Sequence, residues 1–102
     1  MKYQLVLQFP ANSESDFEKL IDLEDKIEAQ MGSEHEVDGH DFGGGEMNLF
    51  IFTNDATDAF DKIQKIISVT TYPGLKAAFR HVEGDEYTLL WPKDACCTFS
   101  VL

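Results

Sequence analysis

The segment VDGHDFGGGEMNLFIFTND, residues 37–55, holds the side chains best suited to chemistry. His40 and Asp41 are adjacent, and Glu46 follows across three glycines. Imidazole titrates near neutral pH without help, and a carboxylate within hydrogen-bond reach can orient it as a general base. His40, Asp41 and Glu46 are therefore candidate catalytic residues of an acid/base site, with Glu24 as a further carboxylate. The alternative is a surface histidine beside an acid. In either case a hairpin here predicts that Asp41 or Glu46 contacts His40.

The acidic residues around His40 are also of the types that bind zinc, manganese or iron. On a regular strand, residues an odd number of positions apart point to opposite faces, so His35 and His40 cannot bind one ion together. By the same alternation, Glu36 and Asp38 share a face with His40. A structural site needs three or four convergent ligands, so the sequence predicts no metal and no other cofactor.

Three consecutive glycines precede the most apolar run of the chain. Gly43, Gly44 and Gly45 can adopt positive φ and leave backbone amides uncovered, which suits a hairpin turn or a place where a ligand approaches the main chain. We favour the turn. In the run over residues 47–53, Phe50 and Phe52 share one face of the predicted strand. These glycines and phenylalanines are the candidate binding residues.

Composition indicates one small domain over residues 1–102, with residues 92–102 as a C-terminal tail. A chain of 102 residues with 43% hydrophobic side chains can fill a single core without a disulfide. Cys96 and Cys97 are adjacent, which excludes a disulfide framework. The first ten residues are too short and too polar for a signal peptide or a membrane span. We therefore expect a cytoplasmic protein that does not bind membranes.

The formal charge of −11 is unevenly distributed. Residues 14–61 contain 15 of the 19 acidic residues and two basic ones, a net of −13, and the remainder of the chain is at +2. The negative electrostatic field of residues 14–61 repels nucleic acid and speeds the encounter with a basic partner. The simpler interpretation is a soluble protein with acidic helix faces.

The first half of the chain shows clear periodicity. Residues 2–9 alternate as a strand, with one apolar face made of Tyr3, Leu5, Leu7 and Phe9. A capping box at Ser15 starts a helix to about Met31 whose apolar side is Phe17, Leu20, Ile21, Ile27 and Met31. Glu24 falls inside that apolar arc, either at its margin or partly buried with a partner, and we favour the margin.

The remaining elements follow from the same signals. A polar edge strand covers residues 33–42, and a buried central strand covers residues 47–53. Asp55 caps a second helix with an apolar stripe of Ala56, Ala59, Phe60, Ile63, Ile66 and Ile67. A loop over residues 68–74 leads to a hairpin of strands over residues 75–82 and 87–91.

This order, β-α-β-β-α-β-β, predicts an α+β fold: a ferredoxin-like sandwich in which two helices cover one face of an antiparallel sheet. The segments GHDFGGGEMN, residues 39–48, and YTLLWP, residues 87–92, resemble those of small uncharacterised bacterial proteins of this fold. The resemblance covers most of the chain. It implies no catalytic residue, since that family has no established activity.

Two function classes follow. The first is a small acidic interaction module, regulatory or of the immunity or inhibitor type, with the glycine turn and the open sheet face as its contact surface. Its partner is a second copy or another protein, possibly a basic one, and neither nucleic acid nor membrane. The second is a small-molecule-binding or acid/base enzyme centred on His40, Asp41 and Glu46. The sequence favours the first.

Overall fold

The computed structural model describes residues 2–10, 14–30, 35–43, 45–66, 75–84 and 86–91, with residues 14–17, 42–43 and 66 described by their backbone alone. The expected tail over residues 92–102, including Cys96 and Cys97, and the expected loop over residues 68–74 lie outside these ranges. The elements are β1 (Tyr3–Pro10), α1 (Glu14–Gln30), β2 (His35–Gly43), β3 (Glu46–Thr53), α2 (Ala56–Ile66), β4 (Lys76–His81) and β5 (Thr88–Trp91).

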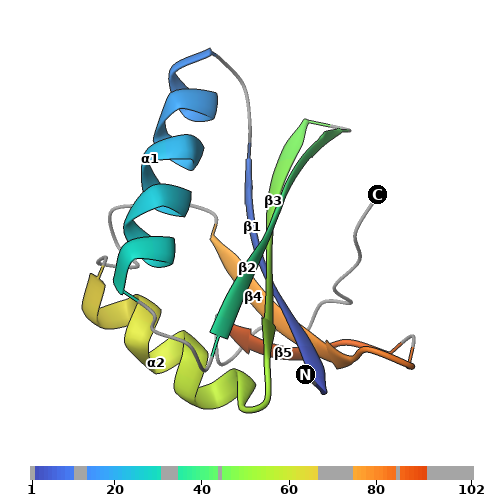
Figure 1. The fold of residues 1–102 in the computed structure, drawn as a ribbon. Coiled ribbons are helices and arrows are strands. Elements are labelled where there is room, and N and C mark those ends of the chain that lie inside the picture. The colour runs from blue at the N-terminus through green and yellow to red at the C-terminus, as the bar shows by residue number, and fades with distance from the viewer. Residues whose placement is uncertain are drawn as a thin grey trace.

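The five strands form one antiparallel sheet in the order β2-β3-β1-β4-β5. Both helices lie on the same side of it (Figure 1). The predicted α+β class, with two helices over an antiparallel sheet, is thereby confirmed.

The main core lies between the helices and the sheet. Leu5, Leu7 and Phe9 face the helices, as the alternation of the first strand predicts. They pack against Leu20, Leu23 and Ile27 of α1 and Ala59, Phe60 and Ile63 of α2. Leu23 is fully buried, although the predicted stripe omitted it. At about 100° per residue, Leu20, Leu23 and Ile27 form a narrow arc, so Glu24 lies at its edge.

The register of β3 decides where Phe50 and Phe52 lie. Met47, Leu49 and Ile51 are buried beneath the helices. Because successive side chains of a strand alternate between faces, Phe50 and Phe52 lie on the opposite side of the sheet. Both are half-buried. We call this side, opposite the helices, the outer sheet face.

One extra residue interrupts β2. Val37 pairs with Ile51 and Gly39 with Phe50, so Asp38 is inserted without a partner, as in a β-bulge. Gly39 has a φ of 150°, which side-chain-bearing residues rarely adopt. The extra residue shifts the alternation of side chains by one position in the rest of the strand. His35 and His40 therefore lie on the same face of the sheet, the one that the helices cover. The prediction that they point to opposite faces was wrong, because it assumed an uninterrupted strand.

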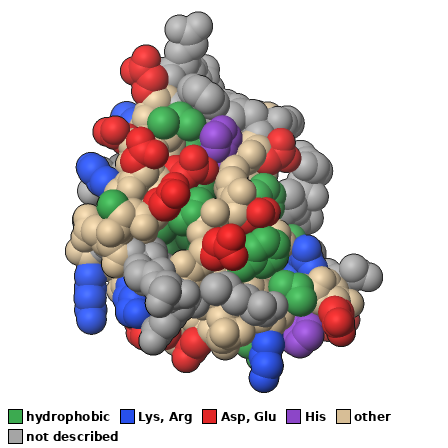
Figure 2. All heavy atoms as spheres, in the orientation of Figure 1, with side chains coloured by type: hydrophobic (Ala, Val, Ile, Leu, Met, Phe, Trp, Pro, Cys, Tyr) green, Lys and Arg blue, Asp and Glu red, His purple; other side chains and the backbone are tan. Residues whose placement is uncertain are grey.

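A tight turn joins β2 to β3. Gly43 pairs with Glu46, and Gly45 between them has a φ of 79°. Gly44, the remaining glycine among the candidate binding residues, lies outside the described residues. Within the ranges that the structure describes, none of the helices is long and apolar enough to cross a membrane. Figure 2 shows Asp and Glu side chains gathered over the part of the surface where α1 lies in Figure 1.

Candidate functional site

His40 of β2 contacts α1. Its Nδ1 lies 2.9 Å from Oε2 of Glu24, and the side chains are 30% and 17% exposed. The bulge at Asp38 turns His40 toward the helix, and the position of Glu24 at the edge of the buried arc brings its carboxylate to the sheet. Glu24 therefore lies at the margin of the apolar arc, as the sequence analysis favoured, and it also has a partner, which that analysis gave as the alternative. The pair can hold a proton between a carboxylate and an imidazole.

Asp41 and Glu46 lie on the other side of the sheet from His40. His40 pairs with Leu49, which is buried beneath the helices, whereas Asp41 pairs with Asn48 and Glu46 with Gly43. Alternation therefore places Asp41 and Glu46 on the outer sheet face. The structure brings His40 together with Glu24, the fourth candidate, and separates it from the two carboxylates nearest in sequence.

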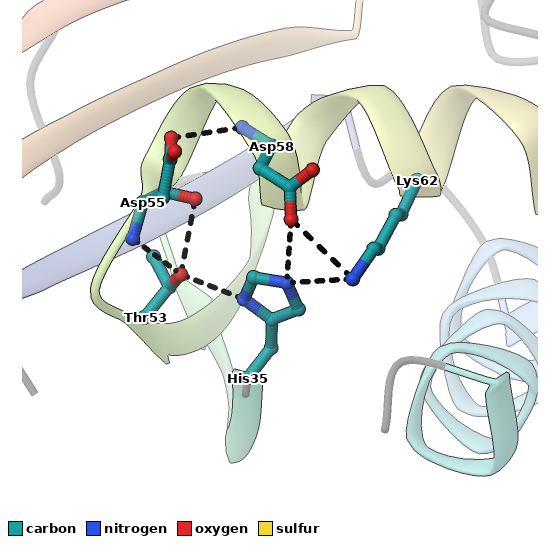
Figure 3. A network of polar contacts seen from close by, with 5 residues as sticks. All are labelled: His35, Thr53, Asp55, Asp58 and Lys62. Carbon is teal, nitrogen blue, oxygen red and sulfur yellow. Dashed lines mark hydrogen bonds and ion pairs between the residues drawn. The ribbon is translucent and has the colours of Figure 1, made fainter. Parts of the chain in front are cut away.

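A second histidine, His35, lies in a network that the sequence analysis did not identify (Figure 3). Its side chain is 2% exposed, and its ring lies between Thr53 at the end of β3 and two residues of α2. Nδ1 lies 2.7 Å from the hydroxyl of Thr53, and Nε2 lies 3.3 Å from Oδ2 of Asp58 and 3.5 Å from Nζ of Lys62. The network joins β2, β3 and α2.

The hydroxyl of Thr53 fixes the proton arrangement of His35. It donates to the carbonyl of Asp55 at 3.1 Å and accepts from the Asp55 amide at 3.0 Å. A hydroxyl has one hydrogen, so Nδ1 of His35 must donate to the second lone pair of the Thr53 oxygen. Nε2 then either carries a second proton, donated to Asp58, or accepts a hydrogen bond from Lys62.

Asp58 is the charged end of this network. The hydrogen bond from Lys62, at 3.3 Å, holds the pKa of the Asp58 carboxyl below its ordinary value of 3.8, and His35 acts in the same direction. Asp58 also donates its backbone amide to Oδ1 of Asp55, which caps α2 as the sequence predicts. Since Thr53 is fully buried and its hydroxyl is engaged three times, it is not an available nucleophile.

The outer sheet face is ordered in cross-strand rows. The Phe50 row contains Gly39, Phe50, Val6, Ala78 and Leu89. Val6 and Ala78 are fully buried, with Phe50, Tyr87 and Leu89 packed around them as half-buried neighbours. This is a second, smaller apolar cluster, and its aromatic rim remains partly accessible to another molecule.

Polar rows flank the Phe50 row on each side. The Phe52 row contains Glu36, Phe52, Gln4 and Arg80, and the Asn48 row contains Asp41, Asn48, Gln8 and Lys76. In the centre of the second row, the amide of Gln8 donates to Oδ1 of Asn48 at 3.0 Å, and both side chains are buried. Each polar row begins with an acid on β2 and ends with a base on β4.

The described residues also form hollows elsewhere. One of about 450 Å³ lies beside Tyr3, Phe79 and Arg80 near the turn after β4, and one of about 340 Å³ is lined by His35, Asn54, Asp55 and Asp58. Arg80 closes the turn next to the larger hollow, because its Nη1 donates to the carbonyls of His81, Val82 and Gly84. Within the described residues, no three His, Cys, Asp or Glu side chains converge in a metal-binding arrangement.

Comparison with known proteins returned no family model, no curated protein and no solved structure that matches this chain.

Proposed function

We propose that this chain is a small acidic protein-interaction module, regulatory or of the immunity or inhibitor type, whose contact surface is the outer sheet face. The strand order β2-β3-β1-β4, with both helices on one side, supports a ferredoxin-like framework extended by β5. Such a framework buries one sheet face under its helices and leaves the other for recognition. Function is then carried by the residues of the Phe50 row and the two polar rows beside it.

A single observation carries this proposal: Phe50 and Phe52 are half-buried on a face that the helices do not cover. Burial of apolar surface contributes about 25 cal/mol per Å², and aromatic rings bring the largest areas. The adjacent Leu89 and Tyr87 extend the patch around Val6. A contiguous apolar patch with a charged rim is the usual anatomy of a protein contact surface.

The charge of the chain favours a protein over a nucleic acid as the occupant. Affinity for nucleic acid comes largely from basic side chains that neutralise phosphates. The cross-strand rows of the outer sheet face contain two basic residues, Lys76 and Arg80. The whole chain has a formal net charge of −11, so these two residues do not make a basic surface. Binding to another protein does not require an excess of basic side chains, because the apolar and charged groups of that protein can complement those of the three rows.

Photo-crosslinking in the cells that make the protein tests this proposal. A photoreactive phenylalanine replaces Phe52 in one variant and the exposed Lys65 on α2 in the other. We expect a covalent protein adduct from position 52 and none from position 65, and we expect a further Phe50→Glu substitution to remove the adduct. If position 52 yields no adduct, or yields the same adducts as position 65, the outer sheet face is not a protein contact surface.

The contact between His40 and Glu24 supports a second candidate function, an acid/base site. A carboxylate 2.9 Å from Nδ1 orients an imidazole and increases its nucleophilicity. Diethyl pyrocarbonate, which acylates neutral imidazole, should then modify His40 faster than the exposed His81, and Glu24→Gln should abolish the difference. If His40 and His81 of the wild-type protein are modified at equal rates, the contact between His40 and Glu24 has a structural role alone.

A further inference from the structure

We infer that a groove along one end of the sheet binds an extended segment of another protein, one that carries a basic and an aromatic side chain two residues apart. We call this groove the end groove. Its accessible wall runs from Asp55, just before α2, past Tyr3 and Phe79 to the turn after β4. It lies at the ends of the strands and not on the outer sheet face. The inference therefore goes beyond the proposed function and adds a second contact site.

Shared residues join three hollows into the end groove. The hollow of about 450 Å³ near the turn after β4 shares Tyr3 and Phe79 with a hollow of about 240 Å³ at the start of α2. That second hollow shares Asn54 and Asp55 with the hollow of about 340 Å³ beside Asp58. The three hollows thus follow one another from β4, across β1, to the end of β3.

The register of the sheet gives the length of the end groove. His35 and Tyr3 both pair with Thr53. Tyr3 also pairs with His81, so one cross-strand row runs from β2 to β4 along this end of the sheet. Four neighbouring strands, about 4.8 Å apart, span about 14 Å, which is the length of about four residues of extended chain at about 3.3 Å per residue. The end groove therefore has the length of a short peptide segment.

Aromatic rings form the middle of the end groove. The rings of Tyr3 and Phe79 meet edge to face with their centroids 5.6 Å apart, and both side chains are half-buried. The exposed Thr57, in the first turn of α2, lines the same hollow. Aromatic rings favour edge-to-face and offset contacts with further rings at similar distances. The middle of the groove is therefore suited to an aromatic side chain.

Asp55 supplies the charge of the end groove. It is exposed and lines both of the smaller hollows. Its Oδ1 accepts the backbone amide of Asp58 (Figure 3), and among the described residues no basic side chain forms an ion pair with it. Asp58, by contrast, already contacts Lys62 at 3.3 Å. A basic side chain in the groove would meet an unpaired carboxylate, and the acidity of residues 14–61 would speed its arrival.

The distance between these two features selects the spacing of the ligand. Asp55, Tyr3 and Phe79 line the same hollow. In an extended chain, side chains two residues apart lie on the same side and about 6.6 Å from each other. A basic side chain can therefore reach Asp55 while an aromatic side chain two residues away lies against the rings. At the far end the groove is lined by Arg80 and Glu86, whose opposite charges favour neither sign.

Titration of the nitrogen-15-labelled full chain with short synthetic peptides tests this inference. The first peptide is acetyl-Ala-Arg-Ala-Phe-Ala-amide. The second has Glu in place of Arg, and the third has Ala in place of Phe. We expect the first peptide to shift the amide signals of Asn54, Asp55 and Thr57 saturably at millimolar concentrations. The other two should each bind about fivefold more weakly, a loss of about 1 kcal/mol.

Asp55→Asn separates the charge of the end groove from the fold. Asparagine caps helices as well as aspartate does, because its side-chain carbonyl accepts the same amide hydrogen bond. We expect this variant to bind the first peptide about fivefold more weakly than the wild type. Asp61→Asn makes the same charge change at another exposed position of α2 and should leave the affinity unchanged. Circular dichroism should show both variants folded.

Equal affinity of the wild type and of folded Asp55→Asn for the first peptide overturns the inference. Equal binding of the three peptides overturns it as well, and so does the absence of any saturable shift at millimolar peptide concentration. Shifts confined to Phe50 and Phe52 would overturn it while sustaining the outer sheet face as a contact surface. A photo-crosslinking experiment without an adduct from position 52 would contradict the proposed function and leave this inference in place.

Discussion

Nδ1 of His40 and Oε2 of Glu24 lie 2.9 Å apart, a contact between β2 and α1 that depends on the single inserted residue Asp38. Without the insertion, alternation would turn His40 to the outer sheet face and leave Glu24 beside an apolar edge. The bulge therefore places the imidazole of His40 on the face that the helices cover, and it places the carboxylate of Asp41 on the outer sheet face. One inserted residue determines the chemistry of both faces.

The first prediction is that His40 and Glu24 are energetically coupled. Glu24→Ala, His40→Ala and the double variant form a cycle in which urea denaturation should give a coupling energy of about 1 kcal/mol, because both groups are less than one third exposed. Asp25→Ala removes the same charge from an exposed neighbouring position and should show no coupling to His40→Ala. A coupling energy of zero would mean that the contact does not stabilise the protein.

The second prediction concerns the bulge. Gly39→Ala should destabilise the protein by about 1–3 kcal/mol, because a side chain at a φ of 150° is strained even though an added Cβ would meet no atom within 4 Å. Gly84→Ala is the control. Its Cβ would lie at ordinary contact distances of 3.6 Å from His81, and its φ is not in the positive region. If Gly39→Ala and Gly84→Ala have the same midpoint of unfolding in urea, the backbone conformation at residue 39 does not require a glycine.

Much of the fold could be predicted because its signals are local. The alternation from Tyr3 to Phe9 and the apolar stripe of α2 can each be recognised within one element. The alternation was correct, and so were the described side chains of the stripe, Ala56, Ala59, Phe60 and Ile63, which are buried. The bulge was missed although a glycine within a predicted strand, Gly39, signals one. The contacts of His35 with Thr53 and Asp58 span 18 and 23 residues, so they depend on how β2, β3 and α2 meet. Local periodicity carries no information on such distances. For the same reason the sequence analysis expected Asp41 or Glu46, and not Glu24, to contact His40.

The third prediction tests the buried hydroxyl. Thr53→Val keeps the shape of the side chain but leaves Nδ1 of His35 and the amide of Asp55 without their partner. Loss of a buried hydrogen-bond partner costs about 1–3 kcal/mol, so the free energy of unfolding should fall by that amount. Thr88→Val on β5, where the side chain is exposed, should leave stability nearly unchanged. If the two variants are equally stable, the His35 network does not contribute to folding.

The fourth prediction is a pH dependence from Asp58. Its pKa is lowered in the folded protein by Lys62 and then by His35. The stabilisation is therefore fully present above the ordinary value of 3.8 and is lost as the pH falls through the lower folded value. Urea midpoints measured through this acid range should fall less steeply in Asp58→Asn than in the wild type. The exposed Asp61→Asn on the same helix should retain the wild-type slope, and an unchanged slope in Asp58→Asn would contradict the assignment.

The contact surface itself is tested most directly by nuclear magnetic resonance with a soluble paramagnetic agent, which broadens the signals of protons that another molecule can approach. We predict that the ring protons of Phe50 and Phe52, which are half-buried on the outer sheet face, broaden as the agent is added, whereas the methyl groups of Leu49, buried beneath the helices, do not. Rings as well protected as the Leu49 methyl groups would contradict the assignment of the outer sheet face as a contact surface.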